Sequence, residues 1–295
     1  MKASSPSLNR SFVARTAGGK SRGLWILSLI SLCAWVLLPG CSIKRMAVNK
    51  LGDALAAGGT SFSSDDDPDL IRDAAPFSLK TMESLLAESP RHEGLRRAAA
   101  SGFTQYAYAF VQMAADEAEA TDYNSSERLR ERARRLYVRA LAHGLRGLEV
   151  RHPGFEASLR RDAESAVKVL TRRDVPIAFW TTVPWAALIA LSKDNPALIG
   201  ELPIATAMID RLLELDPDWN NGAIHSFLIS FEPSRPGGAS DAPNRCRARF
   251  QKVMTLSQGS LAGPYVALAE TVSLAGNNRA EFESLLQKAL SVDLS

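Results

Sequence analysis

The residue types that most often carry out chemistry are few in this chain and are not grouped. The four histidines are His92, His143, His152 and His225. None of them has a second histidine, a cysteine or an acid at a recognised metal-ligand spacing. Neither a Gly-x-Ser-x-Gly turn nor a glycine-rich phosphate loop is present. We therefore predict that the protein is not an enzyme and holds no metal or cofactor. The enzymatic alternative is a hydrolase that uses Glu232 or Glu270 with His225, but no nucleophile is paired with these groups.

Cys41 lies where the sequence indicates a covalent modification. Residues 1–23 are polar and positive, and Leu24–Leu38 is a 15-residue apolar run. A membrane-spanning helix needs about 20 apolar residues, whereas the core of a signal peptide needs roughly 7–15. The run ends in Leu-Pro-Gly-Cys, which resembles the bacterial lipoprotein cleavage box. We predict that residues 1–40 are a signal peptide that is removed and that Cys41 is lipidated; the alternative is a secreted protein with a chance cysteine.

The predicted anchor sets the expected location and organisation of the mature chain. Ser42 follows Cys41, and a residue other than aspartate at this position usually permits export to the outer membrane in Gram-negative bacteria. We expect the inner leaflet of the outer membrane, with the protein facing the periplasm. Residues 41–66 would carry the anchor, a first helix and an acidic linker, and residues 67–295 would form one helical domain.

The charge balance gives no indication of nucleic-acid binding. The chain has 35 Lys and Arg against 32 Asp and Glu, and residues 1–40 contain five basic residues and no acid. The basic excess therefore lies in the predicted signal peptide, and the remainder is slightly acidic.

Aromatic residues suggest a ligand site more strongly than the titratable ones. Trp180 and Trp185 share the nearly uncharged segment Ile177–Leu191. Such a segment is either buried in the core or faces an apolar cleft or another subunit. Two further apolar segments contribute polar groups, so the candidate cleft or interface consists of Trp180, Trp185, Trp219, Asn221, His225, Tyr265 and Glu270.

Helical spacing of apolar residues recurs along the mature chain and predicts the elements that would position these residues. In residues 128–151 and 101–118 the apolar positions recur at steps of three and four, which places them on one face of a helix. Asp67-Pro68 and Asn195-Pro196 each place a capping side chain before a first-turn proline. No segment alternates as a strand would, so we predict an all-α fold.

Four windows of sixteen residues align without gaps, at residues 75–90, 202–217, 243–258 and 279–294. One column holds Met82, Ile209, Phe250 and Leu286, and the column four residues later holds Leu86, Leu213, Met254 and Leu290. This pattern resembles the second helix of a tetratricopeptide repeat. It predicts stacked helix hairpins, with degenerate tetratricopeptide-like repeats that form one superhelical domain.

Several segments of the mature chain together resemble the TatT family, the T-component lipoproteins of some tripartite ATP-independent periplasmic (TRAP) transporters. They are DDDPDLIRDAAPFSLKTMESLLAESP (65–90), ASGFTQYAYAFVQ (100–112), RARRLYVRALAHGLRGLE (132–149), WAALIALSKDNPALIGELP (185–203), WNNGAIHSFLISFE (219–232) and AGPYVALAETVSLAGNNRAEFESLLQKAL (262–290). The resemblance implies a lipid anchor, assembly into a homotrimer and association with the solute-binding P-component of the transporter. It also implies a cleft or pore for a hydrophobic small-molecule ligand, and it implies no catalytic residues.

The sequence therefore leaves two functional hypotheses. The first is a periplasm-facing TRAP accessory lipoprotein that docks the solute-binding protein and binds or conducts a hydrophobic organic ligand. The second is a ligand-free tetratricopeptide-like scaffold for assembly of the outer membrane or peptidoglycan. A bound apolar molecule would separate the two.

Overall fold

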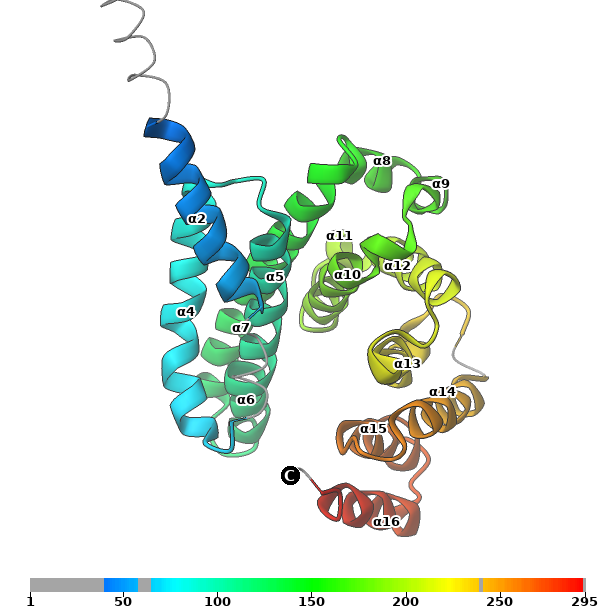
Figure 1. The fold of residues 1–295 in the computed structure, drawn as a ribbon. Coiled ribbons are helices and arrows are strands. Elements are labelled where there is room, and N and C mark those ends of the chain that lie inside the picture. Colours follow the sequence, from blue (N-terminus) through cyan, green and yellow to red (C-terminus); the bar gives the residue numbers. More distant parts are fainter. Residues whose placement is uncertain (1–39, 58–64, 239–240, 294–295) are drawn as a thin grey trace, which may run out of the picture. The chain divides into compact units, whose positions relative to one another are not determined.

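The computed structural model describes residues 40–57, 65–238 and 241–293, and every regular element in these ranges is a helix (Figure 1). The predicted all-α fold is confirmed.

The chain forms two compact units, residues 1–47 and 48–295, whose boundary falls inside α2 (Gly40–Ala57). Residues 1–39 and the Cys41 side chain lie outside the described part, so the signal peptide and lipidation stay predictions. Within the described ranges, no helix has both the length and the hydropathy to cross a membrane.

The second unit contains the end of α2 and all later helices. In chain order these are α4 (Pro68–Glu88), α5 (Glu93–Ala107), α6 (Met113–Ala118), α7 (Tyr123–Arg151), α8 (Phe155–Arg161), α9 (Ala163–Ala166), α10 (Val175–Ala190), α11 (Pro196–Ile199), α12 (Leu202–Leu215), α13 (Trp219–Phe231), α14 (Ala242–Ser257), α15 (Gly263–Leu268) and α16 (Arg279–Leu290). Short 3-10 segments lie at Val167–Val169, Arg172–Asp174 and Glu232–Ser234, and π-helical segments lie at Tyr108–Gln112 and Ala269–Leu274.

Helices begin where the sequence provides a capping side chain. The Asp67 carboxylate accepts a hydrogen bond from the Leu70 backbone N–H, and Pro68 occupies the first turn of α4. Asn195 caps α11 in the same way, ahead of Pro196. Both predicted starts are confirmed, because each side chain satisfies a backbone donor that has no partner inside its helix.

Helices that follow one another in the sequence pack against one another in the second unit. Contacts join α4 to α5, α5 to α7, α7 to α10, α10 to α12, and α13 to α14 and α15. Close approach of α7 and α10 requires a glycine, because a methyl group at Gly144 would collide with Thr181. The four aligned windows lie on α4, α12, α14 and α16, and the tetratricopeptide-like character of their packing stays a prediction.

The apolar interior has two parts. The larger cluster extends from Leu79 on α4 to Phe231 at the end of α13. The smaller one contains Ile229, Cys246 and Phe250, together with residues of α15, of the π-helical segment that follows α15, and of α16. The C-terminal helices therefore have a hydrophobic core of their own, which α13 connects to the larger cluster.

The segment 101–118 is not one regular helix as its apolar spacing predicts. Residues Tyr108–Gln112 form a π-helical turn between α5 and α6. The wider turn inserts one residue, so that the fully buried positions become Ala107, Val111 and Ala115 in steps of four. A second π-helical segment, Ala269–Leu274, extends α15.

Candidate functional site

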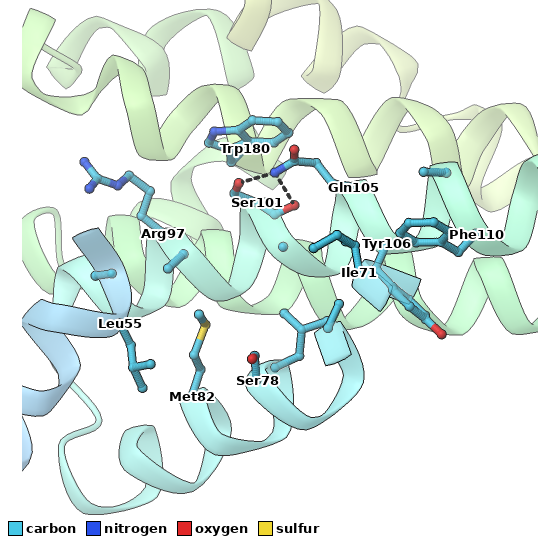
Figure 2. Close-up of a pocket in the computed structure, with 16 residues that line it drawn as sticks. Leu55, Ile71, Ser78, Met82, Arg97, Ser101, Gln105, Tyr106, Phe110 and Trp180 are labelled. Atoms are coloured by element: carbon cyan, nitrogen blue, oxygen red, sulfur yellow. Dashed lines mark hydrogen bonds between the residues drawn. The ribbon is translucent and has the colours of Figure 1, made fainter. Parts of the chain in front are cut away.

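A mainly apolar cavity with a volume of about 350 Å³ lies over α5 (Figure 2). Residues from α5 and the adjoining π turn form its floor. The walls come from α4, from Leu55 and Ala56 of α2, and from Trp180 of α10. The volume lies at the lower end of the range for small-molecule sites, about 300–1,000 Å³. This cavity can therefore accommodate one small, mainly apolar molecule.

Small side chains on α5 open the space, and larger side chains from other helices border it. Ala98, Gly102 and Ala109 contribute little volume to the floor. At Gly102 an added methyl carbon would come within 2.7 Å of the Leu79 side chain, so this glycine also sets the spacing between α4 and α5. The cavity thus results from small residues on one helix that face larger residues on its neighbours.

One row of polar groups runs along the floor. Arg97, Ser101 and Gln105 follow at intervals of four on α5 and share one helix face (Figure 2). The Gln105 Nε2 atom donates to the Ser101 Oγ atom at 2.8 Å. Few polar groups in an otherwise apolar cavity are the usual composition of a small-ligand site, where they fix the orientation of the ligand.

The two tryptophans of the segment Ile177–Leu191 occupy different environments. Trp180 is half-buried and lines the cavity. Trp185 is fully buried in the larger core cluster, and its Nε1 atom donates to Glu201 at 2.7 Å. The guanidinium of Arg160 lies 5.5 Å from the centre of the Trp185 ring system. Of this pair, only Trp180 borders the cavity.

The three predicted site residues of α13 are also outside the cavity. Trp219 packs on Phe179, with ring centroids 4.9 Å apart. Asn221 is exposed in a left-handed turn with φ of 54°, a conformation that asparagine tolerates better than most residues. His225 is buried, and burial together with the positive charges of Arg249 and Lys252 lowers its pKa. These placements give Trp219 and His225 packing roles and Asn221 a backbone role.

Tyr265 and Glu270 belong to the C-terminal helices. Tyr265 packs edge-on against Phe250 in the smaller core cluster. Glu270 is exposed on the second π-helical segment and acts electrostatically on Tyr108 of the first. Tyr108 is 55% exposed, and its partial removal from solvent, followed by the negative charges of Glu270 and Asp116, raises its pKa. The seven predicted residues therefore do not gather at one site.

Most cavity-lining residues were not identified by sequence reasoning. On the amphipathic helix α5, Arg97 resembles an exposed charge and Ser101 an exposed hydroxyl. Met82 on α4 resembles a core residue. The available signal was the row of small residues along α5, but such a row also indicates close helix packing. The sequence pattern alone does not separate these two outcomes.

A buried polar network lies at the contact of α4, α5 and α7. The His143 Nε2 atom lies 3.2 Å from Glu83 Oε1, and its Nδ1 atom lies 3.0 Å from the Arg96 guanidinium. Because Arg96 can only donate, Nδ1 accepts and the Nε2 proton points to Glu83. Burial lowers the pKa of His143, and Arg96 and Arg146 lower it further, while Glu83 acts in the opposite direction. The network therefore favours a neutral imidazole.

We expect the free energy of unfolding to decrease as the pH falls through the usual histidine range. A histidine whose pKa in the folded state is below its unfolded value of about 6.5 stabilises the fold fully above about pH 6.5. This contribution decreases as the pH falls below that value. Each buried histidine of this kind contributes a slope of up to about 1.4 kcal/mol per pH unit. Urea unfolding of the wild type, His143→Gln and His225→Gln between neutral and mildly acidic pH measures the slope. Each substitution should reduce it, and an unchanged slope in both variants would contradict the assignment.

Comparison with known proteins agrees with the extent of the helical unit. The sequence model of the family described as TRAP transporter T-component matches residues 64–295. A protein of Treponema pallidum (strain Nichols), described as an uncharacterized protein, is 29% identical over 276 residues. That alignment covers 88% of this chain and 85% of the Treponema protein. The matched family range contains every helix from α4 onward.

Proposed function

Because this chain belongs to the TRAP transporter T-component family, we propose that it is a periplasm-facing lipoprotein that docks the solute-binding protein and binds a hydrophobic organic ligand. Family membership makes it an accessory component of a TRAP transport system with a role in the cell envelope. Beyond this role, we propose the docking partner, the ligand, the lipid anchor and the outer-membrane location. A lipid anchor at Cys41 would raise the local concentration of the docked complex at the membrane.

The cavity over α5 is the observation that carries the ligand-binding part. It has a mainly apolar lining, with Leu79, Met82 and Phe110 among its members, and few polar groups, namely the row on α5 and Ser78 on α4. Trp180 adds a large flat surface on the side opposite α4. A mainly apolar lining with few polar groups is the usual composition of a small-ligand site, and it favours the ligand-binding function over a ligand-free scaffold.

Exposed apolar side chains on α4 support the docking part. Leu70 and Phe77 are 56% and 78% exposed and lie seven residues apart, which places them on one face of the helix. Aromatic residues are enriched in protein interfaces and are frequent hot spots there. We assign this face to contact with the solute-binding protein.

We expect Phe77→Ser to weaken binding of the purified solute-binding protein from the same transporter by about tenfold or more. Interferometry with the chain immobilised measures this affinity. Tyr123→Ser is the matched control, since Tyr123 is 65% exposed at the start of α7, and it should leave the affinity unchanged. Absence of binding by the wild type would contradict docking. If Phe77→Ser instead lowers the mass found by light scattering, the face is an interface between copies of this chain.

A further inference from the structure

The cavity over α5 has one charged lining residue within the described part of the chain, Arg97. Arg97 is exposed as a residue, and it forms no ion pair with a described carboxylate. Its neighbour Arg96 is buried and donates to the Pro90 carbonyl and to His143. Arg96 therefore serves the fold, whereas Arg97 is available for an external partner.

The surroundings of Arg97 are positively charged. A smaller space of about 190 Å³ adjoins it and is also lined by Arg151, Arg173 and Glu93. Arg151 pairs with Glu93 and, at 3.0 Å, with Asp174. Three arginine residues thus lie in this region with two acidic residues, so positively charged residues are in excess at the Arg97 end of the cavity. An anion is favoured at this end.

The opposite end is apolar. Figure 2 shows Arg97 near α2 at one end of the row on α5, and Phe110 at the other end. Ser101, between them, accepts a hydrogen bond from Gln105, and its own hydroxyl proton can be donated to a ligand. The lining therefore changes along α5 from a cation through hydroxyl and amide groups to aromatic carbon.

We propose that the ligand of this cavity is an amphipathic monocarboxylate, with its carboxylate on Arg97 and its hydrocarbon part between Trp180 and Met82. This inference rests on the proposed function and specifies the chemical class of its ligand. The planar guanidinium can bind a carboxylate through two parallel hydrogen bonds. A phospholipid also combines an anion with apolar chains. A volume of about 350 Å³ suits one hydrocarbon chain, so we choose a free acid over a phospholipid.

The test compares octanoate with 1-octanol, which has the same chain without the charge, by titration calorimetry on the purified chain. We expect Arg97→Gln to weaken octanoate binding by about tenfold to a hundredfold and to leave 1-octanol binding within about twofold. Arg97→Lys should retain part of the octanoate affinity. The matched control is Arg128→Gln, because Arg128 is exposed on α7 and does not line the cavity. It should bind octanoate as the wild type does.

The outcomes separate the two proposals. Equal binding of octanoate by the wild type and Arg97→Gln would overturn the carboxylate assignment while leaving the cavity as an apolar site. Failure of both octanoate and 1-octanol to bind would overturn the cavity as a ligand site as well, and it would leave the docking result with Phe77→Ser unaffected. Binding of phosphatidylglycerol vesicles that depends on Arg97, without binding of octanoate, would overturn the choice of a free acid.

Discussion

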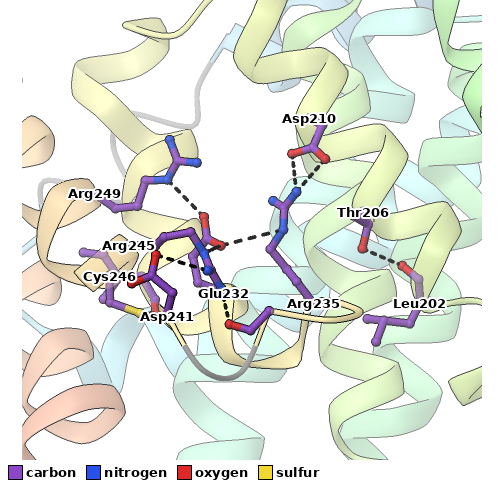
Figure 3. Close-up of polar contacts among 11 residues, drawn as sticks. Leu202, Thr206, Asp210, Glu232, Arg235, Asp241, Arg245, Cys246 and Arg249 are labelled. Atoms are coloured by element: carbon purple, nitrogen blue, oxygen red, sulfur yellow. Dashed lines mark hydrogen bonds and ion pairs between the residues drawn. The ribbon is translucent and has the colours of Figure 1, made fainter. Parts of the chain in front are cut away.

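Glu232→Ala is expected to lower the free energy of unfolding by about 3 kcal/mol, the lower end of what removal of one partner from a buried ion pair costs. The Glu232 side chain is 1% exposed and lies at the end of α13, facing α14 (Figure 3). Its Oε2 atom lies 2.8 Å from Arg245 Nε, and its Oε1 atom lies 3.1 Å from Arg249 Nε. A third guanidinium, that of Arg235, lies 3.7 Å away. Alanine would leave these partly buried cations without their shared carboxylate.

The loss should be concentrated in the C-terminal helices. Arg235 keeps its pair with Asp210 on α12, at 2.6 Å, whereas Arg249 loses the carboxylate to which it is bonded. Beside the cluster, Cys246 of the smaller core donates to the Ile229 carbonyl. We therefore expect hydrogen exchange to accelerate in α14–α16 before it does so in α4–α7. Urea unfolding gives the overall change, and mass-spectrometric hydrogen exchange locates it.

Glu214→Ala provides the comparison for that experiment. Glu214 is 66% exposed and pairs with Arg211 one turn away on α12, a type of pair that contributes less than about 1 kcal/mol. Its removal should change stability by about 0.5 kcal/mol or less. If Glu232→Ala were no more destabilising than Glu214→Ala, the cluster would not hold α13 to α14.

The sequence was sufficient for the helices and insufficient for the local departures from helical geometry. Apolar spacing and the caps at Asp67 and Asn195 depend on short-range physics, so they are readable along the chain. The π turn at Tyr108–Gln112 cannot be read along the chain, because its residues have no distinctive composition and their contacts include the distant helix α7. The left-handed turn at Asn220–Gly222 had a signal, since asparagine and glycine tolerate positive φ, but that segment was interpreted as part of a cleft.

The candidate site was harder to predict than the fold, because burial of a residue depends on which helices meet around it. Arg96 and Arg97 are adjacent and chemically identical, yet one is buried and the other borders the cavity. The four aligned windows did identify helix faces that pack, such as Ile209 and Phe250. A cavity is instead a property of three or four helices together, and no spacing within one segment encodes it.

Trp185→Ala is expected to destabilise the protein by about 3–5 kcal/mol, the usual cost of truncating a large buried aromatic residue. Trp185 is 0% exposed and is the largest fully buried side chain of the described residues. The substitution would also remove the hydrogen bond of 2.7 Å from its Nε1 atom to Glu201, leaving that carboxylate with fewer donors. Urea unfolding measures the change. Trp185→Phe fills much of the same space without the N–H donor, so it should lose less stability than alanine.

Trp180→Ala tests whether the two tryptophans differ in role as their positions indicate. Trp180 is half-buried on the cavity wall, so its truncation should cost about 1 kcal/mol of stability and weaken octanoate binding. At a temperature where Trp185→Ala remains folded, that variant should bind octanoate like the wild type, because its side chain does not line the cavity. The reverse pattern, with stability lost at Trp180 and binding lost at Trp185, would mean that the ligand enters between α10 and α12 instead of over α5. The two residues lie five apart on one helix, so a difference between them has to arise from what each one touches.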